Sequence, residues 1–132
     1  MRKGRQASLS FHWHDGRRRC TVDRFMIEQV IRNILENALA ACPDPVQVLV
    51  SCRTILSSGV ETLRISCRDN GPGLTPEQRQ HIFDPFYTTK TRGTGLGMTL
   101  AKRMVQAHGG MIEVGDGPGG EIVVELPVSP PA

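Results

Sequence analysis

Two glycine clusters carry the residues of this chain that are best suited to hold a charged ligand. The first, Asp69-Asn70-Gly71-Pro72-Gly73, follows an apolar run that predicts a strand, so the Asp69 carboxylate is expected at the edge of a sheet. There it can accept a hydrogen bond from an amino group. Gly71 and Gly73 allow the backbone to turn through positive φ and to approach a flat ligand closely.

The second cluster alternates Gly93, Gly95 and Gly97 and then opens a helix at about Met98. The first N–H groups of a helix have no partner within it and favour an anion, for which phosphate is our expectation. Taken by itself, such a glycine run is equally typical of a flexible surface turn before a helix. Its meaning therefore depends on the rest of the chain.

A long helix must position a pair of asparagines. Asp23 is a typical N-cap, and the helix is expected to end near Ala41, before Pro43. Asn33 and Asn37 are four residues apart, so they lie on one face and border the apolar stripe. As merely exposed polar residues they would lower helix propensity without a benefit, which favours a functional role. The stripe comprises Phe25, Ile27, Val30, Ile31, Ile34, Leu35, Ala38 and Leu39.

The remaining elements follow from alternation and turn signals. Asp15-Gly16 predicts a hairpin between short strands, and Thr75-Pro76 begins a short helix. Gly109-Gly110 ends the helix that opens at Met98, and His108 is interpreted as a capping residue. Strands are predicted at 9–13, 19–22, 46–54, 63–69, 111–114 and 122–126.

Four motifs together resemble those of a known family. Residues 69–74, 83–90 and 93–98 are similar to the G1, F and G2 boxes of sensor histidine kinases, and 33–38 is similar to their N box. The resemblance is to the ATP-binding catalytic domain, within the wider group that includes gyrase-type ATPases. It spans roughly residues 23 to 127. It implies an α+β fold, the Bergerat two-layer α/β sandwich, with a mixed sheet of five to six strands and three helices on one face.

The resemblance also implies a role for each matched residue. Asp69 would accept from the adenine amino group above a floor shaped by Gly71 and Gly73. Asn37 would bind Mg²⁺, for which an amide oxygen is a suitable hard ligand, and Asn33 would contact a phosphate or a metal-bound water. Glu36 would polarise the acceptor, although a solvated helix glutamate is an equally good interpretation. Phosphate contacts would come from Lys90, Gly93, Thr94, Gly95, Leu96 and Gly97.

The implied function is binding of ATP with Mg²⁺ and presentation of the γ-phosphate to a histidine on a separate dimerisation domain, with a response regulator downstream. Phe83 and Phe86 would anchor the ATP lid and dock on that phosphoacceptor domain; ordinary packing is the alternative. Gyrase-type relatives carry a glutamate at the position of Asn33. An asparagine cannot act as that general base, so the site is expected to hold ATP without hydrolysing it readily.

Two other classes of function stay open: an ATP-operated clamp or hydrolase of the gyrase type, and a nucleotide-binding regulatory module or serine kinase of the anti-sigma type. The chain also departs from the family pattern. Ala40 and Ala41 stand where a basic and an aromatic residue are common, and Gly119-Gly120 lacks the usual threonine. No stretch resembles the phosphoacceptor helix, so this chain is not expected to be a complete autokinase.

Composition sets further limits. With 132 residues the chain is expected to form a single domain, residues 1–132, and its net charge is +3. Arg17-Arg18-Arg19 has no interleaved aromatic residues and favours a hairpin tip over a nucleic-acid site. The four cysteines are widely spaced, which favours reduced thiols in the cytoplasm over a zinc site. We expect a monomer without membrane contact, although the resemblance allows a membrane-anchored parent protein.

Overall fold

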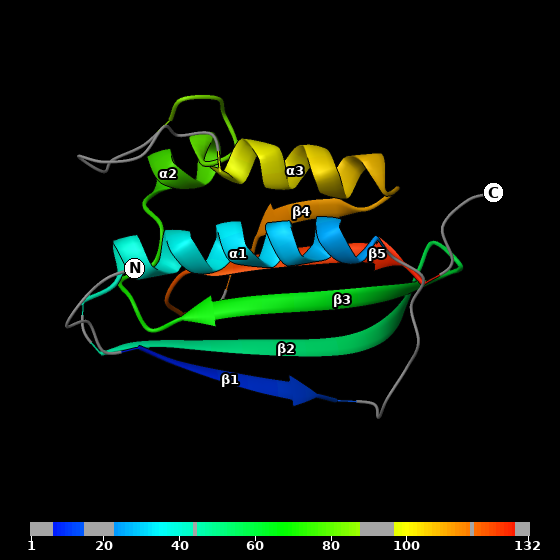
Figure 1. Cartoon of the computed structure of the whole chain (residues 1–132), viewed down its shortest axis with the longest axis horizontal. Coiled ribbons are helices and arrows are strands. Elements are labelled where there is room, and N and C mark those ends of the chain that lie inside the picture. The colour runs from blue at the N-terminus through cyan, green and yellow to red at the C-terminus, as the bar shows by residue number, and fades with distance from the viewer. Residues whose placement is uncertain (1–6, 15–22, 44, 88–96, 117, 129–132) are drawn as a thin grey trace.

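The computed structural model describes residues 7–14, 23–43, 45–87, 97–116 and 118–128. Five strands form one sheet in the order β1-β2-β3-β5-β4, and three helices cover one of its faces (Figure 1). β1 runs parallel to β2 and the other pairs are antiparallel, so the mixed sheet and the α+β sandwich are confirmed. The elements are β1 Ala7–Trp13, α1 Arg24–Ala41, β2 Val46–Ser57, β3 Val60–Asp69, α2 Pro76–His81, α3 Gly97–Ala107, β4 Met111–Val114 and β5 Glu121–Pro127.

The central hairpin of the sheet is longer than the sequence predicts. β2 and β3 pair from Val48 opposite Asp69 to Ser57 opposite Val60. The turn between them places Ser58 at φ 50° and Gly59 at φ 78°. Two successive residues with positive φ match the right-handed twist of the flanking strands, so the strands stay paired up to the turn.

α1 begins as predicted, with the Asp23 side chain accepting a hydrogen bond from the Met26 N–H at 3.1 Å. Its fully buried residues recur every fourth position. The other predicted stripe residues, except Phe25, are partly buried and pack against the same core. Phe25 is wrong as a core residue, because it lies outside this row and its exposed fraction is 67%. Met26, which the sequence analysis did not include, occupies the core position instead. The buried row is Met26, Val30, Ile34 and Ala38.

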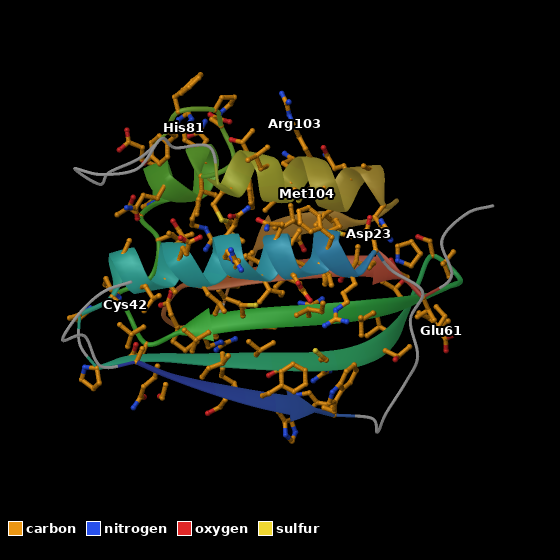
Figure 2. The ribbon with its side chains drawn as sticks, viewed as in Figure 1. Asp23, Cys42, Glu61, His81, Arg103 and Met104 are labelled. Atoms are coloured by element: carbon orange, nitrogen blue, oxygen red, sulfur yellow. The ribbon has the colours of Figure 1, made fainter. Side chains whose placement is uncertain are left out.

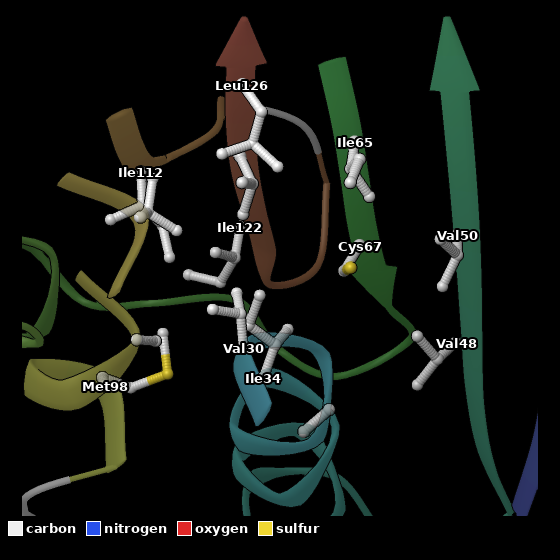
Figure 3. Close-up of a cluster of buried hydrophobic side chains, with 14 of the residues drawn as sticks. Val30, Ile34, Val48, Val50, Ile65, Cys67, Met98, Ile112, Ile122 and Leu126 are labelled. Atoms are coloured by element: carbon white, nitrogen blue, oxygen red, sulfur yellow. The ribbon is translucent and has the colours of Figure 1, made fainter. Parts of the chain in front are cut away.

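The core lies between the helices and the sheet. Figure 3 shows Val30 and Ile34 of α1 facing Cys67 of β3 and Ile122 of β5. α3 adds a second buried row to the same core, and its far end approaches α1. There the His108 Nε2 atom accepts a hydrogen bond from the Asp23 N–H at 3.3 Å, so this histidine joins two helix ends. The buried residues of α3 are Met98, Thr99, Ala101 and Val105.

The short helix α2 forms as predicted. Thr75 and Gln78 make a capping box, in which each side chain bonds the backbone of the other residue, and Pro76 stands in the first turn. The predicted hairpin turn at Asp15-Gly16, the strand at 19–22 and the Arg17–Arg19 run lie outside the described residues. Among the described helices, none is long and apolar enough to cross a membrane.

Candidate functional site

The Asp69 carboxylate is fixed by main-chain groups at the end of β3. Its Oδ1 atom accepts hydrogen bonds from the Gly71 N–H and the Gly120 N–H, both at 2.9 Å. The Asp69 N–H in turn donates to the Gly120 carbonyl at 2.8 Å. Within the described part of the chain, no hydrogen bond of the Oδ2 atom is found. One carboxylate oxygen is therefore held and the other is available to a ligand.

Two glycines of the loop before β5 come so close to Asp69 that a side chain would not fit. A Cβ atom on Gly119 would lie 2.3 Å from the Asp69 carbonyl oxygen, and one on Gly120 would lie 2.6 Å from the Asp69 Oδ2 atom. Gly119 also has a φ of 75°. At the position of the usual threonine, the backbone N–H of Gly120 holds the aspartate, and the close approach of Asp69 leaves no room for a side chain.

The first glycine cluster, Gly71 and Gly73, is also closely packed. A Cβ atom on Gly71 would lie 2.7 Å from the Cys42 Sγ atom, and Figure 2 places Cys42 at the C-terminal end of α1. Gly73 has a φ of 86°, and its Cβ would lie 3.1 Å from the Gly119 carbonyl oxygen. These contacts bring together the end of α1, the loop after β3 and the loop before β5.

A hollow opens beside Asp69 between α1 and the sheet. Most of its wall is apolar, which suits one flat, uncharged ring system with a polar contact at the edge. Asn37 and Asp69 are polar side chains of this wall, and Ala41, a departure from the family pattern, also lines it. The lining residues are Ile34, Asn37, Ala38, Ala41, Cys42, Val48, Cys67, Asp69, Pro72, Gly73, Leu74, Gly120, Glu121 and Ile122.

Two cysteines, Cys42 and Cys67, line this wall. Burial raises the pKa of the Cys67 thiol to about 12, with smaller contributions from Cys52 and Glu121. The Cys67 thiol is therefore protonated at neutral pH and behaves as a small apolar side chain, not as a nucleophile. Cys52 and Cys67 are both buried in the core.

Asn33 lies one helical turn from Asn37, toward the start of α3. A Cβ atom on Gly97, the first residue of α3, would lie 3.8 Å from the Asn33 amide oxygen. The two asparagines therefore extend from the hollow to the N-terminus of a second helix. Glu36 does not join them, because it is exposed and lines a groove along the outer side of α1.

The two phenylalanines of the predicted lid have different surroundings. Phe83 packs against the core, its carbonyl accepts from the Thr99 hydroxyl at 3.0 Å, and the Lys102 Nζ atom lies 5.5 Å from its ring centre. Phe86 has an exposed fraction of 73% and a φ of 65°. Lys90, Gly93, Thr94, Gly95 and Leu96 lie outside the described residues.

The fold and the site define a class: an α+β sandwich with a carboxylate-edged hollow between its helices and its sheet. Residues 22–130 match the family model described as "Histidine kinase-, DNA gyrase B-, and HSP90-like ATPase". This match covers most of the chain, and the chain belongs to that family.

Within the family, the similar proteins are sensor histidine kinases. The chain is 40% identical over 98 residues to the C4-dicarboxylate transport sensor protein DctB of Rhizobium meliloti, covering 74% of this chain and 16% of that protein. It is 32% identical over 128 residues to the sensor histidine kinase ZraS of Salmonella typhi, covering 96% of this chain and 27% of that protein. The chain thus spans less than a third of either relative.

Solved structures agree. The nucleotide-free catalytic domain of histidine kinase ThkA superimposes with a TM-score of 0.80 at 29% identity, covering 94% of this chain and 80% of that one. ThkA has also been solved in complex with the response regulator protein TrrA, at a TM-score of 0.71 and 26% identity, with coverage of 90% and 34%. This chain is accordingly a histidine kinase ATPase domain of the two-component type.

Proposed function

We propose that this domain binds ATP together with Mg²⁺ and presents the γ-phosphate to a histidine on a separate dimerisation domain of the same kinase. The observation that supports this most is the Asp69 carboxylate, held by two backbone N–H groups at the edge of an apolar hollow. Such a carboxylate with one oxygen available recognises an amino group on the edge of a flat base.

In this proposal Asp69 reads the adenine. Its Oδ2 atom accepts from the exocyclic amino group, while the two N–H groups on Oδ1 keep the carboxylate from rotating. Gly71 and Gly73 shape the floor of the hollow. The apolar walls supplied by Ile34 and Ile122 then flank the two faces of the base.

The asparagines of α1 extend the site toward the phosphates. Asn37 contributes a hard amide oxygen for Mg²⁺, and Asn33, beside Gly97, contacts a phosphate or a metal-bound water. Bound Mg²⁺ supplies charge neutralisation on the phosphate chain. By resemblance to the family motif, the phosphate cradle comprises Lys90, Gly93, Thr94, Gly95, Leu96 and Gly97.

Phosphoryl transfer is favoured over hydrolysis because Asn33 has no proton equilibrium near neutral pH with which to activate water. Glu36 is exposed and lines a groove along the outer side of α1, and its role in polarising the acceptor stays a prediction. The family members similar to this chain are sensor kinases, which disfavours the gyrase-type clamp and the anti-sigma serine kinase. Robust ATP turnover by the domain, or an acid-stable phosphoserine product, would reinstate those alternatives.

The partners belong to the same proposal. Phe83 anchors the lid, and Phe86, with its exposed ring, is available to dock on the phosphoacceptor domain. A response regulator, as in the solved ThkA complex, is the expected next acceptor of the phosphoryl group. The domain is expected to work in the cytoplasm, with or without a membrane anchor elsewhere in the parent protein.

The first test is calorimetric titration with a non-hydrolysable ATP analogue, with and without Mg²⁺. Asp69→Asn removes a charge-assisted hydrogen bond worth about 1.5–3 kcal/mol, so affinity should fall roughly ten- to a hundredfold. Asp116→Asn is the matched control, because Asp116 is 98% exposed in a surface pair with Arg79. Equal affinities of the wild type and the Asp69 variant would refute the adenine assignment.

The second test adds an isolated phosphoacceptor domain of a related sensor kinase in trans. Acid-labile phosphate on its histidine is expected with wild-type domain and Mg-ATP. Asn37→Ala should abolish the Mg²⁺ dependence of binding and the transfer together. Normal binding with no transfer to any such domain would keep the nucleotide site and reject the kinase role.

A further inference from the structure

The edge of the sheet carries an apolar surface that the nucleotide site does not use. All residues of β1 are exposed, and β1 lies at the sheet edge opposite to β4 (Figure 1). Residues directly paired on neighbouring strands point to the same side of a sheet. Leu9, Phe11 and Trp13 pair with three β2 residues that are buried beneath the helices, so they lie on the helix side. Those β2 residues are Val48, Val50 and Cys52.

These side chains are large and remain in contact with solvent. The exposed fractions are 59% for Leu9, 58% for Phe11 and 36% for Trp13. The Phe11 and Trp13 rings meet edge to face with centres 5.8 Å apart. Contiguous apolar surface of this kind on a soluble domain marks an interaction site more often than isolated exposed residues do.

α1 carries two parallel ridges of residues spaced four apart on the same side of the sheet. One ridge is apolar and partly buried against the core, and a shallow groove separates it from a charged ridge. Ile31 lies roughly 160° around the helix from Asn33, which faces α3, so the apolar ridge is on the β1 side. We call the apolar ridge, the groove and the exposed β1 residues the α1–β1 face. The apolar ridge is Ile27, Ile31 and Leu35, and the charged ridge is Arg24, Glu28, Arg32 and Glu36.

We propose that the α1–β1 face binds a second copy of this chain. The two α1 helices would lie antiparallel, related by a two-fold axis that crosses them at the level of Val30 along the helix. The charged ridge alternates in sign along α1, and this decides the orientation. Reversing the helix direction about Val30 places Arg24 opposite Glu36 of the second copy and Glu28 opposite Arg32 of the second copy. A parallel arrangement would place each charge opposite its own kind.

This self-complementarity is the property that an isologous interface requires. The i, i+4 ridge of one α1 fits the groove between the ridges of the other, as in the commonest class of helix packing. Arg24 and Glu28 already contact each other within one helix at 2.9 Å. At the interface they would join a network of four charges. The monomer expected from the sequence is thereby replaced by a reversible dimer.

The proposal is independent of the proposed function. Asn33 and Asn37 lie on the α3 side of α1, and the hollow beside Asp69 is not part of the α1–β1 face. Dimer formation therefore leaves the nucleotide hollow open. A domain that binds ATP as a monomer would refute the dimer alone, and a dimer without nucleotide affinity would refute the nucleotide site alone.

Sedimentation equilibrium over micromolar to millimolar concentrations tests the dimer. We expect a monomer–dimer equilibrium that Glu28→Arg weakens at least tenfold, because two attractive contacts per dimer become repulsive. Adding Arg32→Glu to that variant restores opposite charges across the axis and should recover most of the affinity. Glu113→Arg is the matched control, since Glu113 is exposed on β4 and the charge change is the same. Thermal melting confirms that each variant is folded.

Trp13 gives an independent readout because it is the single tryptophan of the chain. Its fluorescence emission should shift to shorter wavelength as the concentration rises through the dissociation constant. Phe11→Ser should weaken dimer formation and the shift without any change of charge. A monomer at millimolar concentration would overturn the proposal and leave this face to a different protein. Equal losses in Glu28→Arg and in the charge-swapped double variant would also overturn it.

Discussion

At the Asp69 end of the site main-chain groups hold the functional side chain, whereas the segment from Ile82 to Tyr87 is joined to α3 by side chains. Two backbone N–H groups bond the Asp69 carboxylate, and Gly119 leaves no room for even one added carbon. In the other segment, the main-chain hydrogen bonds are local, from the Asp84 N–H to the His81 carbonyl at 2.8 Å and from the Tyr87 N–H to the Asp84 carbonyl at 3.3 Å. Its contacts with α3 are the Thr99 hydroxyl on the Phe83 carbonyl and a Lys102 ammonium near the Phe83 ring.

The difference matches what each region is proposed to do. A base-reading carboxylate has to keep its position in the absence of ligand, and tightly packed backbone can deform only at a high energetic cost. A segment next to a lid has to change shape, and elements that move are drawn from the less stable parts of a fold. Phe86, a non-glycine residue at φ 65°, is in a conformation that costs of order 1–3 kcal/mol.

The largest expected effect tests the main-chain packing around Asp69. Gly119→Ala introduces a Cβ atom 2.3 Å from the Asp69 carbonyl oxygen at a φ of 75°. We expect a loss of more than about 3 kcal/mol in the free energy of unfolding, since strain and overpacking add. Gly59→Ala is the matched control, with a φ of 78° and no atom within 4 Å of its Cβ. It should cost only about 1 kcal/mol.

Urea unfolding of both variants measures this difference directly. If the two variants lost the same free energy, the close approach of Gly119 to Asp69 would carry no weight. The contrast between the main-chain packing around Asp69 and the side-chain contacts of the segment from Ile82 to Tyr87 would then not hold.

The next prediction separates the two phenylalanines of the segment from Ile82 to Tyr87 (the hinge segment). Phe83→Ala should lower the free energy of unfolding by about 2 kcal/mol, because a partly buried ring is lost from the core. Phe86→Gly should change it by less than about 0.5 kcal/mol, since relief of the positive φ offsets the flexibility of glycine. Thermal or urea unfolding provides the measurement. A large loss in Phe86→Gly would show that the exposed ring is held by contacts within the domain.

The sequence was sufficient for features that depend on near neighbours. The Asp23 cap and the start of the short helix at Thr75-Pro76 involve residues a few positions apart, and the structure contains both. The helical period also located α1. It also gave the side that packs on the sheet, since Val30, Ile34 and Ala38 are buried. Phe25 was assigned to that side because it is apolar, and it is exposed.

Features that depend on distant pairing escaped prediction. Asp69 and Gly120 are 51 residues apart, and only the pairing of β3 with β5 brings them together. The glycine at position 120 therefore looked like a defect of the motif before its N–H was placed on the carboxylate. In the same way, the parallel pairing of β1 with β2 joins segments that no short turn connects. It leaves Leu9 and Phe11 exposed although their alternation is typical of a half-buried strand.

A smaller effect concerns Cys67 in the wall of the hollow. Burial raises the pKa of Cys67 to about 12, above that of an unfolded thiol, so folding favours the protonated form. This stability is complete below the unfolded pKa of about 8.5 and is lost as the pH rises toward the folded value. The free energy of unfolding should fall by about 2 kcal/mol between pH 8 and pH 10. Cys67→Ala should flatten that decline. Parallel slopes in the two proteins would mean that this wall of the hollow is hydrated.

The smallest effect tests how the hinge segment is held to α3. Thr99→Val keeps the shape of a buried side chain and removes the hydroxyl that bonds the Phe83 carbonyl at 3.0 Å. Loss of this bond should cost about 1 kcal/mol in the free energy of unfolding. Because the bond ties the hinge segment to α3, amide exchange should accelerate more in residues 82–87 than at the end of β3. Uniform acceleration in both regions would show that the hinge segment and the Asp69 end unfold as one unit, which the contrast between them does not allow.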